Sequence, residues 1–240
     1  MKKSFAILSK IIVSALTLIS MYLLLFSPTT LRINNTHKMA TTIINRVVEQ
    51  SDNDGLKVGV KMLEESGLEN VLLSELPKKY QHDFSYVNLY QLSRKYDEEG
   101  KITESDIGLK SKNNLTKVIN SYLIKEINRK LKEESTRVHH IISIYRYSLL
   151  AIVLLYVLAI VLFIFNRYWA SAALLIGAVI TYGALLYFVT GANAEFQSQI
   201  YSGINLSINA GVDLGLFIGV IVAIIWPFLL HKIRKSENNA

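Results

Sequence analysis

Four long stretches of the chain are apolar and almost free of charged residues. They cover residues 11–27, 147–166, 169–189 and 212–230. A helix rises about 1.5 Å per residue, so about 20 apolar residues cross the roughly 30 Å hydrocarbon layer of a bilayer. A helix also satisfies its own backbone hydrogen bonds, as a span in lipid must. The sequence therefore predicts a multi-pass membrane protein with four transmembrane helices, TM1 to TM4 in chain order.

Charged residues are concentrated between TM1 and TM2. The chain of 240 residues is 51% apolar and 19% charged, a combination that is unusual for a soluble protein and for one buried wholly in lipid. In residues 28–146, Lys and Arg are mixed with almost as many Asp and Glu, which is typical of a solvated surface. We therefore predict an all-α membrane protein with four transmembrane helices and a helical extracytoplasmic domain, residues 28–146, inserted between TM1 and TM2.

Within this domain, apolar residues recur at helical spacing, and no stretch shows sustained two-residue alternation. Met39 and Ile43 lie four residues apart, so we expect TM1 to continue outward as a helix to about Gln50. The later loop at 190–211 is ambiguous. Its apolar residues fit either a surface helix that includes Phe196 or a strand at residues 204–209, where apolar and polar residues alternate.

The Lys and Arg residues next to the spans predict the orientation. Basic residues precede TM1, follow TM4 and occupy the turn between TM2 and TM3 at Arg167, whereas the loop 190–211 carries none. Because short cytoplasmic loops are enriched in Lys and Arg, we expect the N-terminus (residues 1–10) and the C-terminal tail (231–240) in the cytoplasm. The inserted domain and the loop 190–211 then lie outside.

TM1 also has the features of a targeting segment. Lys2 and Lys3 form a basic start, but no small-residue cleavage site precedes Ser27, so we predict an uncleaved signal anchor rather than a removed signal peptide. The chain contains no Cys, which leaves the exported domain without disulfides or thiolate metal ligands. Together with the Asn-, Lys- and Ile-rich composition, this predicts a cell-membrane protein of a Gram-positive bacterium.

The segment from Asp97 to Asp106 resembles the latter part of an EF-hand calcium loop, with Gly100 at the turn position. A degenerate calcium site there would use three carboxylates: Asp97, Glu99 and Asp106. However, Lys95 stands at the first ligand position and would repel Ca²⁺. The alternative is structural, with Gly100 in a turn and Thr103 capping a short helix through Asp106. We favour this alternative and predict neither a metal nor a cofactor.

No catalytic motif is present in the sequence: it contains no His-Glu-x-x-His, phosphate loop or Gly-x-Ser-x-Gly. The adjacent His139 and His140 point about 100° apart on a helix, so a single metal is a poor fit, and we interpret them as interfacial histidines. The sequence therefore predicts a protein that is not an enzyme.

TM4 carries the clearest signal for helix association. Gly211, Gly215 and Gly219 are four residues apart, and TM3 offers Ala173 and Gly177 at the same spacing. Small residues on one face let membrane helices approach closely. These faces either pack together within one chain, which we favour, or form a homo- or hetero-oligomer.

Few polar residues fall within TM2 to TM4. Asp213 lies at the predicted N-terminus of TM4, where the helix dipole stabilises a carboxylate, so we interpret it as a terminal cap. Tyr156 and Tyr182 are predicted at similar depths. We interpret them as packing groups that lie close enough to share hydrogen bonds.

These observations favour a non-enzymatic membrane protein: an accessory, regulatory or sensing subunit of a cell-envelope complex, associating through its outer domain and small-residue helix faces. The alternative is an oligomeric transporter, channel or pore-forming protein, against which the lack of mid-membrane charges and repeated halves counts. The net charge of +7 comes largely from residues that flank the spans. We therefore expect the bilayer and other membrane proteins as partners, and no nucleic acid.

Overall fold

A computed structural model of the chain describes residues 2–50, 57–58, 61–62, 65–66, 73, 77–109, 114–133 and 135–238. Four of its helices are long and apolar enough to cross a membrane, and the candidate spans are Ser4–Phe26, Ile142–Ile164, Trp169–Ser198 and Ala210–Lys235. They belong to α1 (Lys2–Phe26), α7 (Ser135–Ile164), α8 (Trp169–Gln199) and α9 (Ala210–Asn238). The protein is mostly helical, as predicted.

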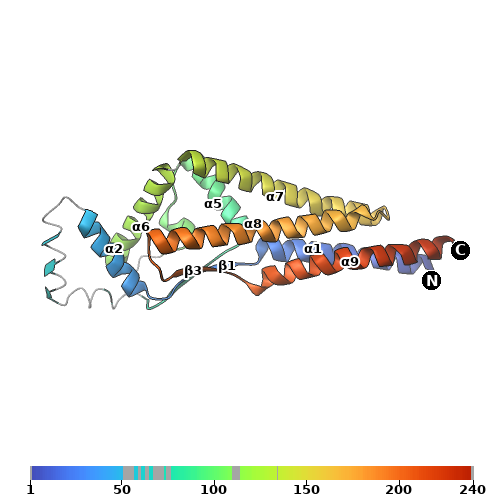
Figure 1. Cartoon of the computed structure of the whole chain (residues 1–240), viewed down its shortest axis with the longest axis horizontal. Helices are drawn as coiled ribbons and strands as arrows, with labels where there is room; N and C mark the ends of the chain where they lie inside the picture. The colour runs from blue at the N-terminus through green and yellow to red at the C-terminus, as the bar shows by residue number, and fades with distance from the viewer. Residues whose placement is uncertain are drawn as a thin grey trace.

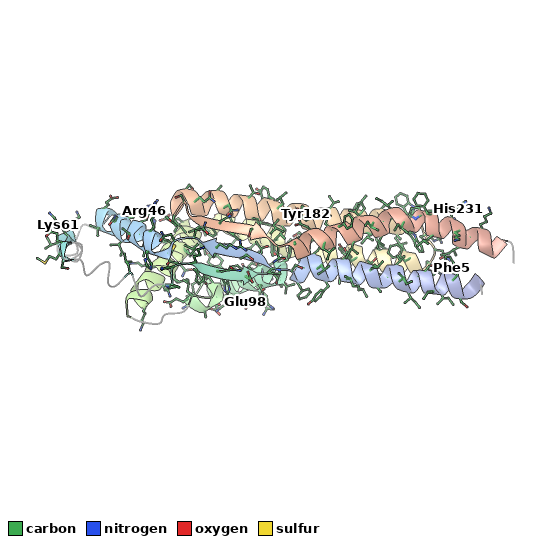
Figure 2. The ribbon with its side chains drawn as sticks, turned by 90° about the horizontal axis from the view of Figure 1, so that it is seen from below. Phe5, Arg46, Lys61, Glu98, Tyr182 and His231 are labelled. Carbon is green, nitrogen blue, oxygen red and sulfur yellow. The ribbon has the colours of Figure 1, made fainter. Side chains whose placement is uncertain are left out.

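The four long helices run beside one another, with both termini at the same end of an elongated molecule (Figure 1). We call this end the terminal end, and the opposite end, which carries the remaining elements, the distal part. In Figure 2, Phe5 and His231 mark the terminal end, and Arg46 and Glu98 lie in the distal part. α8 continues ten residues beyond the predicted end of TM3 and so extends into the distal part.

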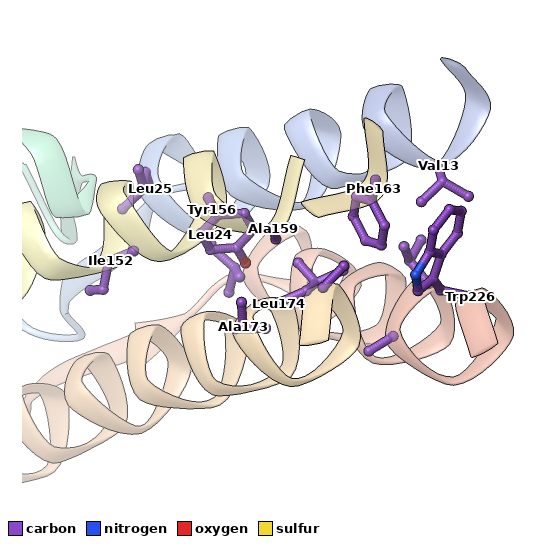
Figure 3. Packing of buried hydrophobic residues seen from close by; sticks show 14 of the residues in the cluster. Val13, Leu24, Leu25, Ile152, Tyr156, Ala159, Phe163, Ala173, Leu174 and Trp226 are labelled. Carbon is purple, nitrogen blue, oxygen red and sulfur yellow. The ribbon is translucent and has the colours of Figure 1, made fainter. Parts of the chain in front are cut away.

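The bundle core forms where α9 packs on both α1 and α8, and α7 packs on α8. Large side chains fill the space between the helices (Figure 3), and the Phe163 and Trp226 rings meet edge-on with their centroids 4.8 Å apart. The opposite helix faces expose large apolar side chains, such as Leu154 and Phe217. An apolar outer surface of this kind suits contact with lipid tails.

The turn between α7 and α8 is tied to the other two spans at the terminal end. Asn166 in this turn has a positive φ of 55°, and carbonyls at the end of a helix need donors from elsewhere. Three donors from α1 and α9 supply them: Lys10 Nζ to Ile164 O at 3.0 Å, Trp226 Nε1 to Arg167 O at 2.9 Å and Arg234 Nη2 to Asn166 O at 2.9 Å.

A three-stranded antiparallel sheet lies directly beyond the ends of α1 and α9, so the prediction of an all-α fold is wrong in this respect. The strands are β1 (Thr29–Ile33), β2 (Tyr80–Phe84) and β3 (Ile204–Ile208), in the order β2-β1-β3. β3 is the strand alternative predicted for the loop after TM3. The expected continuation of TM1 as a helix to Gln50 is also wrong, because Pro28 disfavours helix at the preceding residue and β-branched threonines follow it.

The other elements that the structure describes in the distal part are α2 (Thr36–Gln50), α5 (Tyr86–Glu99), the 3₁₀ helix η1 (Glu104–Ile107) and α6 (Asn114–Glu133). α2 begins after β1, where Asn35 Oδ1 accepts a hydrogen bond from the Lys38 backbone N–H at 2.9 Å. The spacing that predicted a helix around Met39 corresponds to α2. One face of α2 packs on the sheet in a small core of buried residues: Ile33, Met39, Ile43, Tyr201 and Ile204.

Candidate functional site

An open cleft of about 360 Å³ lies between β2 and α5 in the distal part. Ligand pockets typically measure roughly 300–1,000 Å³, so the cleft is at the small end of that range. Eight residues line it: His82, Asp83 and Phe84 from β2, Asn88, Gln91, Leu92 and Lys95 from α5, and Asp106 from η1. We call it the β2–α5 cleft.

Both ends of α5, which forms one wall of the cleft, are capped. Ser85 and Asn88 form a capping box: Asn88 N donates to Ser85 Oγ at 3.1 Å, and Ser85 N donates to Asn88 Oδ1 at 3.0 Å. At the other end Gly100, with φ of 69°, takes the left-handed conformation that glycine adopts without strain. The wall of the cleft is therefore a helix with well-defined ends.

The N-terminus of α5 is anchored to α7 by an aromatic pair. Tyr86 is only 1% exposed, and its ring stacks on Tyr145 with centroids 4.5 Å apart. Tyr145 Oη donates to Tyr86 O at 2.7 Å, and the two hydroxyls of Tyr86 and Ser148 lie 3.0 Å apart. Burial raises the pKa of the Tyr86 phenol despite the hydrogen bond with Ser148. The phenol thus stays neutral, as an aromatic anchor packed in an apolar core must.

Asp106, the last carboxylate of the degenerate calcium motif, has both a cationic and a backbone partner. Asp106 Oδ1 accepts from Lys95 Nζ at 2.7 Å, and its Oδ2 accepts from Thr103 N at 2.8 Å and Thr103 Oγ1 at 2.6 Å. Desolvation raises the Asp106 pKa, but the hydrogen bonds from Lys95 and Thr103 outweigh it and leave that pKa below its usual value. Thr103 and Asp106 thus have the capping geometry of the structural interpretation, and Lys95 neutralises the carboxylate.

Asp97, the first residue of that motif, binds α7 instead. Arg146 Nη1 donates to Asp97 Oδ2 at 2.6 Å, and His139 Nε2 lies 3.6 Å from Asp97 Oδ1. Glu99 stands at the end of α5, one residue before Gly100. Within the described residues, no group of three or more His, Asp or Glu side chains could hold a metal.

The glycine face of TM4 packs on α1 of the same chain. A Cβ added at Gly211 would lie 2.5 Å from Ser27 Oγ, and one added at Gly215 would lie 3.0 Å from the Leu24 backbone nitrogen. At Gly219 it would lie 2.8 Å from Ser20 Oγ. These glycines therefore let α9 approach α1 of the same chain closely, whereas the predicted intrachain partner of this face was TM3.

The small residues of TM3 pack on a different helix. A Cβ at Gly177 would lie 3.3 Å from the Tyr156 ring of α7, and Ala173 is 7% exposed in the bundle core. The TM3 and TM4 small-residue faces therefore do not pack face to face. α8 does contact α9 at Gly219, where an added Cβ would lie 3.1 Å from the Cβ of Ala178.

Tyr156 and Tyr182, which the sequence predicted at similar depths and close enough to share hydrogen bonds, belong to separate hydrogen-bond networks. Tyr156 Oη lies 3.3 Å from Ser20 Oγ, which itself donates to Gly215 O at 2.7 Å. Tyr182 Oη donates to Asp213 Oδ1 at 3.0 Å, in the first turn of α9. Sequence reasoning missed Ser20, although a hydroxyl inside TM1 is itself a signal for an interhelical hydrogen bond.

The outer edge of β3 is covered by two amide side chains of α8. Asn193 is bidentate: its Nδ2 donates to Leu206 O at 2.8 Å, and its Oδ1 accepts from Leu206 N at 2.6 Å. Gln197 Nε2 donates to Ile204 O at 3.0 Å. The sequence offered only a weak signal for this contact, two amides four residues apart just beyond TM3.

No family model, curated protein or solved structure shows significant similarity to this chain. The class of protein therefore follows from the structure alone. Four apolar helices with the length of membrane spans, which carry a small sheet-and-helix distal part, indicate a multi-pass membrane protein.

Proposed function

We propose that the chain is a non-enzymatic accessory or sensing subunit of a cell-envelope complex, whose distal part binds a partner outside the cytoplasm. The observation that supports this function is the direct continuity between sheet and spans. β1 begins three residues after α1 ends, and β3 ends two residues before α9 begins. These two strands pair with each other along their whole length, from Thr29 opposite Ile208 to Ile33 opposite Ile204.

This continuity gives a partner at the cleft a mechanical route to the bilayer. β2 lines the cleft and pairs with β1, and β1 is covalently joined to α1. A force or a change of conformation at β2 therefore acts on α1 through a ladder of backbone hydrogen bonds, without crossing a flexible linker. A connection of this kind is what a transmembrane sensor or regulator requires.

The distribution of charge supports an extracytoplasmic distal part. Lys10 and Arg234 bind carbonyls of the α7–α8 turn, which contains Arg167, at the terminal end of the molecule. Cytoplasmic ends of spans carry an excess of Lys and Arg, so the terminal end is cytoplasmic in this proposal. The same proposal includes the cell membrane of a Gram-positive bacterium, supported by the Cys-free and Asn-, Lys- and Ile-rich composition, and an uncleaved TM1 anchor, supported by the lack of a small-residue cleavage site before Ser27. Since the glycine faces are occupied by helices of the same chain, we assign partner binding to the distal part.

Site-specific photo-crosslinking in native membranes tests this function. A photoreactive residue placed at either exposed distal position, Glu98 or Asn205, should form an adduct with one and the same partner protein. A photoreactive residue at the lipid-facing Leu154 of α7 should form no adduct with that partner. Absence of a defined protein adduct from the distal positions would contradict partner binding. Reporters fused after Glu99 and after Lys235 should lie on opposite sides of the membrane, and finding both on one side would refute the orientation.

A further inference from the structure

The β2–α5 cleft runs along the edge of β2 rather than across one face of the sheet. Successive residues of a strand point to opposite faces, so a cleft on one face would be lined by every second residue. Three consecutive residues, His82, Asp83 and Phe84, line this cleft. The other edge of β2 is paired with β1, so the cleft follows the edge that is open among the described residues.

The two edges of the sheet differ in what covers them. At β3, the amides of Asn193 and Gln197 bind the backbone groups of Leu206 and Ile204. Among the described residues, the edge of β2 faces an open cleft. The far wall of this cleft is the polar face of α5, on which Asn88 and Gln91 are exposed. An uncovered edge presents backbone donors and acceptors that another extended segment can pair with.

The sides of the cleft are fixed by contacts that do not involve its open centre. The His82 ring occupies the space above Gly108, where an added Cβ would lie 2.1 Å from the ring. Tyr80 Oη donates to Ile107 O at 3.1 Å, which holds the end of η1 against β2. The Lys95–Asp106 pair spans from α5 to η1. The cleft is therefore preformed, and preformed sites lose less entropy on binding.

The charge of the cleft selects among peptides. Its lining contains two carboxylates and one ammonium group, and Lys95 and Asp106 neutralise each other at 2.7 Å. The Asp83 carboxylate is the charge that is left. Its Oδ1 accepts a hydrogen bond from Thr30 Oγ1 at 2.7 Å, and within the described part of the chain it makes no ion pair with Lys, Arg or His. One exposed negative charge on the rim therefore favours a basic side chain on the occupant.

We propose that the β2–α5 cleft binds an extended peptide segment of a partner protein, which adds a fourth strand to the edge of β2 and pairs a Lys or Arg side chain with Asp83. This inference names the partner chemistry for the proposed sensing function and rests on it. Backbone hydrogen bonds supply affinity in this mode, and side chains at alternate positions supply specificity. The bound strand extends the sheet that continues into α1 and α9.

The test uses the full-length protein in lipid nanodiscs and a phage-displayed library of random nine-residue peptides. We expect enrichment of peptides that carry Lys or Arg between apolar residues. A synthetic peptide of the enriched sequence should slow amide hydrogen exchange in residues 80–84, because strand addition protects edge amides. Gln91→Trp, which fills the cleft from α5, should abolish binding, whereas Arg94→Trp, on the same helix outside the cleft lining, should leave it unchanged.

Asp83→Asn keeps an acceptor for Thr30 but removes the negative charge. It should lower the affinity for the basic peptide by about two- to five-fold, as expected for loss of an exposed ion pair. Several results would overturn the inference: no enriched peptide, binding that survives Gln91→Trp, or binding without protection of residues 80–84. Self-association that protects the same residues without peptide would assign the edge to a second copy instead. If photo-crosslinks from Glu98 or Asn205 persist when the peptide result is negative, the proposed function stands and only the cleft assignment fails.

Discussion

Gly215→Ala provides the sharpest test of how the transmembrane helices are held together. An added methyl group would lie 2.9 Å from Leu23 Cβ and 3.0 Å from the Leu24 backbone nitrogen, both on α1. A backbone atom cannot rotate out of the way, so α1 and α9 must move apart. Overpacking of this kind costs about 1–3 kcal/mol, against a gain of about 0.5–1 kcal/mol for removing a helix glycine. We expect a net destabilisation of up to about 2.5 kcal/mol.

The matched control is Gly183→Ala in α8, where an added Cβ would meet nothing within 4 Å. This variant gains helix propensity without overpacking, so its stability should be unchanged or raised by up to about 1 kcal/mol. The assay is reversible unfolding in mixed micelles titrated with sodium dodecyl sulfate, followed by fluorescence. Trp226 is fully buried and Trp169 is exposed, so the change in emission on unfolding reports mainly on Trp226. Equal stability of the two variants would refute the close packing of α9 on α1.

Two further predictions concern the distal part. Asn193→Ala removes both hydrogen bonds to the Leu206 backbone and should cost about 1–3 kcal/mol in local stability; faster exchange of the Leu206 amide measures the effect, and unchanged exchange would contradict the covered edge. The Asp106 pKa is lower in the folded chain than in the unfolded chain. The ionised carboxylate therefore stabilises the fold at pH values above its pKa in the unfolded chain, and this stabilisation is lost as the pH falls through its pKa in the folded chain. Thermal unfolding between about pH 6 and pH 3 should therefore show a loss of stability that is smaller in Asp106→Asn, and identical pH profiles would contradict the assignment.

The sequence predicted the four long apolar helices because composition alone determines which segments prefer lipid. TM3 is the instructive exception. Its apolar stretch ends near Val189, but α8 continues to Gln199 because Asn193 and Gln197 bind β3. The end of a helix that is stabilised by side-chain contacts with a sheet carries no hydropathy signal, so it could not be located from composition.

The sheet was predicted only in part because its strands are short. β3 was one of two alternatives, while β2 was missed although Tyr80, His82 and Phe84 alternate with polar residues. Five residues of alternation are easily matched by chance, and the strand becomes distinct only when β1 pairs with it. The β2–α5 cleft was beyond prediction because it combines residues from β2, α5 and η1, brought together by tertiary packing.

The pairing of β1 with β3 also restricts how α1 and α9 can move. Sliding two paired strands by one residue would turn every side chain to the wrong face of the sheet, and the next allowed register is two residues away, a step of about 6.6 Å. Thr29 and Ile208, at the junctions with the two spans, are fixed opposite each other. The pairing therefore opposes small axial displacements of α1 relative to α9 at this end, and a piston motion must carry both helices together past α7 and α8.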